Sequence, residues 1–182
     1  ENTHDTKTLN SLLSPVVDSI DGFDQAVKSV ETSRFKSIFE EVIADRQGLR
    51  GEIEAKIREA GGTPDDEGTM LASAHRVLMR LRDAVSKGDI AVVDEAERGE
   101  DHIKGKFEKA AKDTELSPPI AQFVATAATR VVKGHDRLRD LKHALHGQLG
   151  AHPPLPRGGA GPPQAGAGAH RFAPTRLRTI PS

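Results

Sequence analysis

Apolar residues recur through the first 146 residues at alternating intervals of three and four, the spacing of amphipathic helices. The pattern is most complete between Leu9 and Val30, and it returns in four later segments. The expected helices cover residues 6–29, 32–60, 69–87, 90–113 and 118–146. No stretch alternates apolar and polar residues with the period of two that a half-buried strand requires. The pattern therefore predicts an all-α domain over residues 6–146.

Glycine and proline mark the expected helix ends. Gly61-Gly62 before Pro64 predicts the end of the second helix, and Gly88 follows the third. Pro15 interrupts the first segment, because proline lacks a backbone N–H donor and crowds the preceding turn. We expect it either to kink this helix or to delay its start.

After His146 the composition changes. Residues 147–182 are rich in Gly, Pro and Ala and contain four arginines and no acidic residue. Such a segment buries too little apolar surface to offset the entropy lost on ordering, so we predict a disordered basic tail. Its PPLP sequence at 153–156 has the form of a polyproline ligand for a protein partner. A passive tail is the simpler interpretation.

Charge and composition exclude several classes of function. The chain has a net charge of −1, and removing the +4 of residues 147–182 leaves −5 for residues 1–146. An acidic body argues against nucleic acid as the partner. The absence of Cys excludes disulfides and thiol chemistry, and no apolar run approaches the roughly 20 residues of a membrane helix. We expect a cytoplasmic protein with no membrane partner, which self-associates through helix faces as a homo-oligomer.

The fourth segment places acidic residues on its buried face. Its periodicity puts Glu100 between Ala96 and Ile103, with Glu97 beside it. The same count turns Glu95 and Asp101 outward. Asp45 and Arg46 fall in the apolar face of the second segment, and His135 lies beside that of the fifth, as the sequence shows. We therefore predict a polar layer inside an apolar bundle.

Two interpretations of this layer remain open. Carboxylates and His that project inward from bundle helices can hold two metal ions, so the candidate ligands for iron or manganese are Asp45, Glu97, Glu100 and His135. Such centres take a Glu-x-x-His pair from each of two helices. The residue three before His135 is Val132, so this pair is incomplete. We favour the alternative, in which Glu100 pairs with Arg46 or a protonated His135 as a buried charge, with no cofactor and no catalytic residue.

Glycines also occur within the expected helices. Six of them lie on or beside an apolar face, namely Gly22, Gly48, Gly51, Gly99, Gly105 and Gly134. Glycine in a helix interior costs about 1 kcal/mol relative to alanine. We expect these positions to let neighbouring helices approach closely.

Five short motifs together resemble an uncharacterised bacterial family of ferritin-like four-helix-bundle proteins with a domain of unknown function. They are Asp21–Ala26 (DGFDQA), Gly61–Pro64 (GGTP), His75-Arg76, Glu95–Asp101 (EAERGED) and His135–Leu141 (HDRLRDL). The resemblance covers residues 7–143. It implies a bundle in which residues 61–88 form a helical crossover between two hairpins. Asp45 and Ser19 stand where the family usually has Glu and Gly.

The resemblance implies no activity. We therefore predict a non-enzymatic binding or assembly protein, linked to stress physiology by analogy with ferritin-like relatives. The alternative is a divergent di-iron or di-manganese carboxylate protein with oxidase or metal-storage activity.

Overall fold

The computed structural model describes residues 2–65 and 70–150, and these form five helices. The helices are α1 (Thr3–Ser29), α2 (Ser33–Glu59), α3 (Met70–Val85), α4 (Asp89–Ala111) and α5 (Pro118–Gly150). No strand occurs in the described ranges, which confirms the all-α prediction. None of these helices combines the length and hydropathy that a membrane crossing requires. Residues 151–182, which hold most of the predicted tail and its PPLP sequence, lie outside the described residues.

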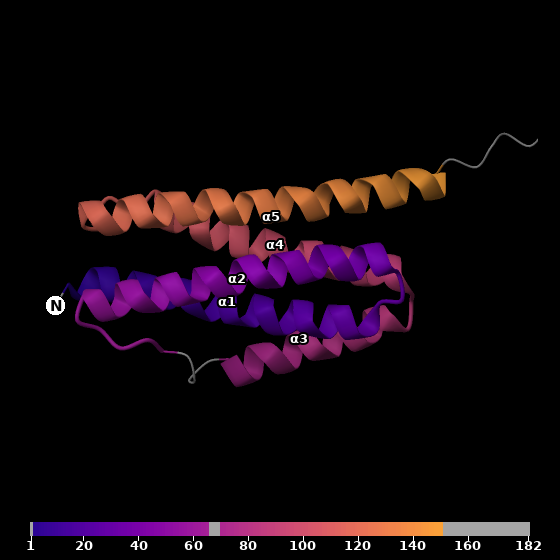
Figure 1. Cartoon of the computed structure of the whole chain (residues 1–182), viewed down its shortest axis with the longest axis horizontal. Helices are drawn as coiled ribbons and strands as arrows, with labels where there is room; N and C mark the ends of the chain where they lie inside the picture. Colours follow the sequence, from indigo (N-terminus) through magenta and orange to yellow (C-terminus); the bar gives the residue numbers. More distant parts are fainter. Residues whose placement is uncertain (1, 66–69, 151–182) are drawn as a thin grey trace, which may run out of the picture. The chain divides into compact units, whose positions relative to one another are not determined.

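The helices associate mainly as two antiparallel pairs. α1 packs extensively on α2, and α4 packs extensively on α5. α1 also contacts α3 and α4, α3 contacts α4, and α2 touches α5 more sparingly. Figure 1 shows that α1, α3 and α5 run in one direction and α2 and α4 run in the other. The chain thus passes from the first pair to the second through α3.

Helix ends follow the turn signals of the sequence. Gly61 (φ 85°) and Gly88 (φ 101°) adopt left-handed backbone conformations that side-chain-bearing residues rarely accept. The Gly62 N–H donates to the Ile57 carbonyl at 2.9 Å, which closes the last turn of α2. α1 begins at Thr3, where the Asn2 side chain accepts from the Asp5 N–H at 3.3 Å. Pro15 lies inside α1, so the expectation that it delays the helix start is wrong.

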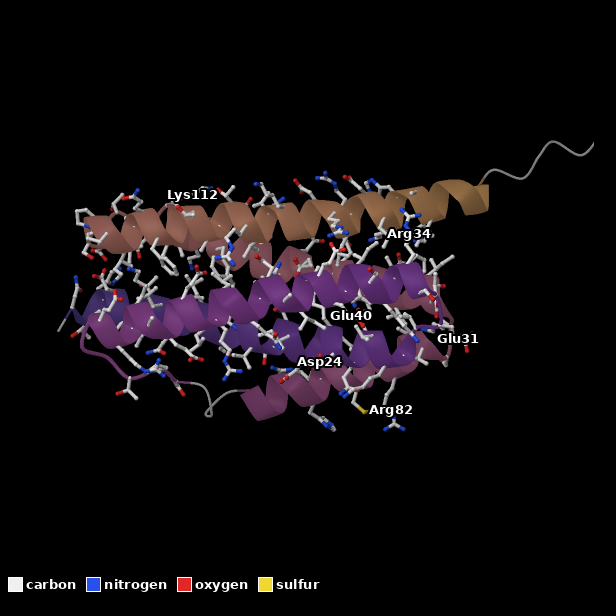
Figure 2. The ribbon with its side chains drawn as sticks, viewed as in Figure 1. Asp24, Glu31, Arg34, Glu40, Arg82 and Lys112 are labelled. Atoms are coloured by element: carbon white, nitrogen blue, oxygen red, sulfur yellow. The ribbon has the colours of Figure 1, made fainter. Side chains whose placement is uncertain are left out.

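The apolar faces of the helices merge into one core. Its largest members are fully buried, among them Leu9, Phe39, Ile53, Phe107 and Leu138. Phe23 of α1 and Phe39 of α2 pack with ring centroids 5.6 Å apart. Each large side chain buried in this way contributes about 1.5–3 kcal/mol of transfer free energy. Charged side chains such as Arg34, Arg82 and Lys112 project from the outer faces (Figure 2).

Ion pairs join α2 to α5 where backbone contacts are few. Arg130 of α5 binds Asp45 at 3.0 Å and also pairs with Glu52. Arg137, two turns further along α5, pairs with Glu41 of α2. All of these side chains are partly exposed, so each pair contributes little alone. The seam between the two helix pairs is therefore polar on its outer side.

Candidate functional site

The centre of the protein holds a buried ion pair between α2 and α4. Arg46 is 0% exposed and Glu100 is 1% exposed. The guanidinium grips the carboxylate with two hydrogen bonds, Nη1 to Oε1 at 2.9 Å and Nη2 to Oε2 at 2.6 Å. This bidentate geometry is the strong form of the arginine–carboxylate interaction. The interpretation that Glu100 is a buried charge paired with Arg46 is confirmed.

Gly134 of α5 makes room for this ion pair. A Cβ atom at Gly134 would lie 2.9 Å from Nη2 of Arg46 and 3.4 Å from Oε2 of Glu100. The helix therefore approaches the pair more closely than alanine would permit. For Gly51, Gly99 and Gly105, an added Cβ would meet nothing within 4 Å. The prediction of close packing is wrong for these three positions.

Burial dominates the electrostatics of the pair. It raises the pKa of the Glu100 carboxyl above its ordinary value, while the adjacent Arg46 charge and its hydrogen bonds act to lower it. The Nε atom of Arg46 is also buried and has no hydrogen-bond partner among the described residues.

A second polar cluster lies between α4 and α5 around His135, which is 4% exposed. Its Nε2 lies 2.5 Å from Oδ1 of Asp101 and 3.8 Å from Oε1 of Glu97. Its Nδ1 lies 3.0 Å from Oδ1 of Asp136. Lys142 donates to Oε2 of Glu97 at 3.0 Å, and this hydrogen bond raises the pKa of the Lys142 ammonium. The cluster thus contains both carboxylates and a competing cation.

Three residues of this cluster could hold a metal ion. One ligand atom from each of Glu97, Asp101 and His135 lies within 4.8 Å of the others. An imidazole and two carboxylates form a donor set that suits Zn²⁺, Mn²⁺ or Fe²⁺. Glu97 and Asp101 also line a hollow of about 430 Å³ between α3, α4 and α5, which gives an ion a route from solvent.

The four predicted metal ligands fall in three different places. Glu97 and His135 come together, Glu100 is held by Arg46, and Asp45 binds Arg130 at the outer seam. Asp101 was expected to face outward, and its side chain is indeed 60% exposed, but its carboxylate reaches His135. The signal for Asp101 was its position one turn after Glu97, because residues four apart share a helix face.

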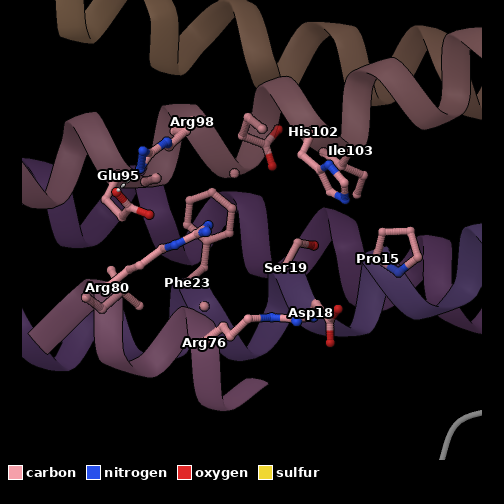
Figure 3. Close-up of a pocket in the computed structure, with 15 residues that line it drawn as sticks. Pro15, Asp18, Ser19, Phe23, Arg76, Arg80, Glu95, Arg98, His102 and Ile103 are labelled. Carbon is pink, nitrogen blue, oxygen red and sulfur yellow. Dashed lines mark hydrogen bonds and ion pairs between the residues drawn. The ribbon is translucent and has the colours of Figure 1, made fainter. Parts of the chain in front are cut away.

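A pocket of about 580 Å³ opens between α1, α3 and α4. Phe23 and Ile103 contribute apolar surface, and Glu100 forms part of the wall, as the lining shows. Figure 3 shows Arg76 and Arg80 entering from α3, with Arg98 and His102 on α4. Arg76 extends toward Asp18 of α1 in this view. Sequence reasoning missed the pocket because no single helix carries a recognisable motif for it.

The fold and these clusters define an all-helical protein with charged groups in its interior. Comparison with protein families matches residues 5–113 to the family described as "Domain of unknown function (DUF2383)". The match covers more than half of the chain, so the protein belongs to this family. It includes Arg46 and Glu100 but ends before α5 and His135. Comparison with curated proteins gives no match.

Proposed function

We propose that this protein is a ferritin-like four-helix bundle that acts as a binding protein and not as an enzyme. The helix directions support the fold, because α1 and α5 run together and opposite to α2 and α4 (Figure 1). Ferritin-like bundles have one long crossover connection between their two helix pairs. Here the chain segment that contains α3 occupies that position between α2 and α4.

The observation that carries the functional proposal is the pairing of carboxylates with arginines. Glu100 is bound by Arg46, and Asp45 is bound by Arg130. A di-metal carboxylate centre needs such carboxylates directed at the ions. A guanidinium that already occupies both oxygens of Glu100 leaves that carboxylate little capacity to bridge metals. We therefore assign these paired carboxylates a role in stabilising the fold and not in binding redox-active metal ions.

We further propose that the protein works in the bacterial cytoplasm under stress, where its helix faces support self-association. This part of the proposal rests on the resemblance of its motifs to ferritin-like proteins and on its acidic helical body. The segment 147–182 would then supply a second, basic contact for a protein partner.

Metal stoichiometry tests the proposal directly. The full chain would be purified without chelator, incubated with Fe²⁺ or Mn²⁺ under anaerobic conditions, desalted and analysed for metal. A binding protein without a metal centre retains far less than one ion per chain. Retention of two ions per chain, together with oxidase activity on Fe²⁺, would contradict the proposal and support a di-metal protein.

The cluster at His135 favours a second candidate, a protein that holds a single cation. Its support is the convergence of ligand atoms from Glu97, Asp101 and His135 within 4.8 Å. In this case one ion per chain is retained, and Glu97→Gln abolishes that retention. Glu95→Gln is the matched control, because Glu95 lies on the same helix outside this ligand group. Equal retention in both variants would reject the cluster as the metal site.

A further inference from the structure

Gly99 lies in the lining of the pocket between α1, α3 and α4. It lies inside α4, where glycine costs about 1 kcal/mol relative to alanine. Packing does not explain it, because an added Cβ would meet nothing within 4 Å. Gly99 lines the pocket, and so does Gly22 of α1 on the opposite wall. A side chain at position 99 would extend into open space, because an added Cβ there meets nothing within 4 Å.

The lining combines an apolar wall with guanidinium groups. Phe23, Leu81 and Ile103 are the large apolar residues of the lining, and they are 4%, 4% and 1% exposed. Arg76, Arg80 and Arg98 are exposed at the rim. Small-molecule sites typically occupy about 300–1,000 Å³. The volume of about 580 Å³ falls within this range.

Arg80 is the group best placed to receive a ligand. It forms no hydrogen bond or ion pair with any residue that the structure describes. Arg98, on the facing helix, has a single contact of 3.5 Å with Glu95. Arginine side chains suit carboxylate and phosphate ligands, since the planar guanidinium donates two parallel hydrogen bonds.

The charges of the pocket lining favour a ligand with a single negative charge. The lining contains three arginines and the carboxylates of Asp18, Glu95 and Glu100. Glu100 is already matched by Arg46, so one positive charge remains in the lining. The basic segment 147–182 has four arginines and no acid, and its charge does not complement this rim.

We propose that this pocket binds a small amphipathic monoanion, with its anionic head at Arg80 and Arg98 and its apolar chain against Phe23, Leu81 and Ile103. The proposal deepens the binding function proposed above and rests on it. The pocket adjoins the hollow beside the His135 cluster, because Arg80 and Arg98 line both, whereas Phe23 and Ile103 line only the pocket.

Decanoate is a suitable probe, because it combines one carboxylate with an unbranched apolar chain. Binding to the full chain would be measured by isothermal titration calorimetry below the aggregation concentration of decanoate. We expect saturable binding of one decanoate per chain. Decanol, which has the chain without the charge, should bind about tenfold more weakly, as expected for loss of a charged hydrogen bond. Equal affinity for decanol would overturn the assignment of an anion.

Two leucine substitutions on α4 test the location. Gly99→Leu fills the pocket and should weaken decanoate binding by at least about tenfold, the loss expected when the volume for an apolar chain is occupied. Gly105→Leu is the matched control, since Gly105 also accepts a Cβ without contact but does not line the pocket. Arg80→Gln should weaken binding about tenfold while decanol binding stays unchanged.

Absence of saturable decanoate binding, or equal affinity in the Gly99→Leu and Gly105→Leu variants, would overturn the proposal. Circular dichroism melting curves would verify that both variants are folded. Failure here leaves the proposed non-enzymatic function testable, because that proposal depends on the metal stoichiometry and not on decanoate.

Discussion

Two neighbouring regions of α4 use arginine in opposite ways. Glu100 faces the interior, where Arg46 pairs with it and both side chains are almost fully buried. Gly99, the preceding residue, lines a pocket whose arginines stand at an exposed rim. The first arginine has its carboxylate partner built into the fold. Arg80 at the pocket has none among the described residues, so its charge is available to a ligand.

The comparison shows how burial decides the role of a guanidinium. A buried ion pair costs several kcal/mol per ion in desolvation, and its mutual attraction must offset that cost. Removing either residue of a buried pair therefore leaves the other as an unpaired buried charge, which destabilises the fold. An exposed arginine keeps its hydration, so the fold hardly depends on it. Single substitutions at these positions can show which arginine the fold depends on.

Arg46→Ala should produce the largest effect. It leaves Glu100 buried without its counter-charge, and breaking a buried pair costs about 3–5 kcal/mol. Urea denaturation followed by circular dichroism would measure the free energy of unfolding. The double variant Arg46→Met/Glu100→Leu is the control, because an apolar pair of similar volume should restore most of the loss. If Arg46→Ala were as stable as the original protein, Glu100 would not depend on Arg46 for its stability in the interior.

Gly134→Ala should have the next largest effect. The new Cβ would approach Nη2 of Arg46 to 2.9 Å, and the bidentate pair leaves that atom little freedom to move. Overpacking costs about 1–3 kcal/mol, and the better helix propensity of alanine returns about 1 kcal/mol. We expect a net loss of about 1 kcal/mol in the same denaturation experiment.

Gly99→Ala is the matched control for Gly134→Ala. Its Cβ meets nothing, so the protein should become more stable by up to about 1 kcal/mol. Equal changes at both positions would mean that the space beside Gly134 is not limiting.

Acidification should test the hydrogen bonds that the Asp89 carboxylate accepts. Asp89 at the start of α4 accepts hydrogen bonds from the backbone N–H groups of Glu31 and Thr32 and from the Thr32 hydroxyl. Burial acts to raise the pKa of Asp89, but these hydrogen bonds outweigh it and lower the pKa below the ordinary value of 3.8. The stability that Asp89 contributes is therefore present above pH 3.8 and is lost as the pH falls through its lower pKa in the folded protein.

Asp89→Asn should remove this part of the acid sensitivity. Melting temperatures measured from neutral to acidic pH would show a shallower decline for the variant than for the original protein. Asp83→Asn is the control, because Asp83 is exposed and pairs only with Lys87, one helical turn away, among the described residues. An unchanged pH profile in Asp89→Asn would contradict the assigned role.

Arg80→Ala should have the smallest effect on stability. Arg80 is exposed and forms no ion pair with a described residue, so the free energy of unfolding should change by less than about 0.5 kcal/mol. The difference in unfolding free energy between Arg46→Ala and Arg80→Ala therefore compares a buried arginine with an exposed one directly. A loss of several kcal/mol at Arg80 would mean that this arginine supports the fold and is not reserved for a ligand.

Much of the fold could be predicted from local sequence. Helical periodicity located five helices and placed Glu100 in the interior, because the period of a helix links sequence position to face. Glycine at positions 61 and 88 marked turns that need a positive φ. Pro15 was harder to interpret, since tertiary contacts keep it buried inside α1 despite its missing donor. Local rules give the preference of a residue, and packing can override that preference.

The candidate sites were less predictable. Periodicity turned Asp101 away from the core, yet its carboxylate reaches across to His135 of α5. The same reasoning placed Asp45 in the polar layer, whereas it binds Arg130 at the outer seam. Both differences arise because the reach of a side chain depends on the rotation and spacing of the neighbouring helix. These quantities are absent from the pattern of a single helix.

The sequence by itself determined that this protein is helical, where its helices turn, and that a charged residue of α4 faces inward. The tertiary structure decided which partner each charge has. It matched Arg46 to Glu100, placed Gly134 beside that pair, and joined three helices around a pocket lined by Gly99. The physical reason is that periodicity is a property of one helix, whereas ion pairs and cavities depend on how several helices meet.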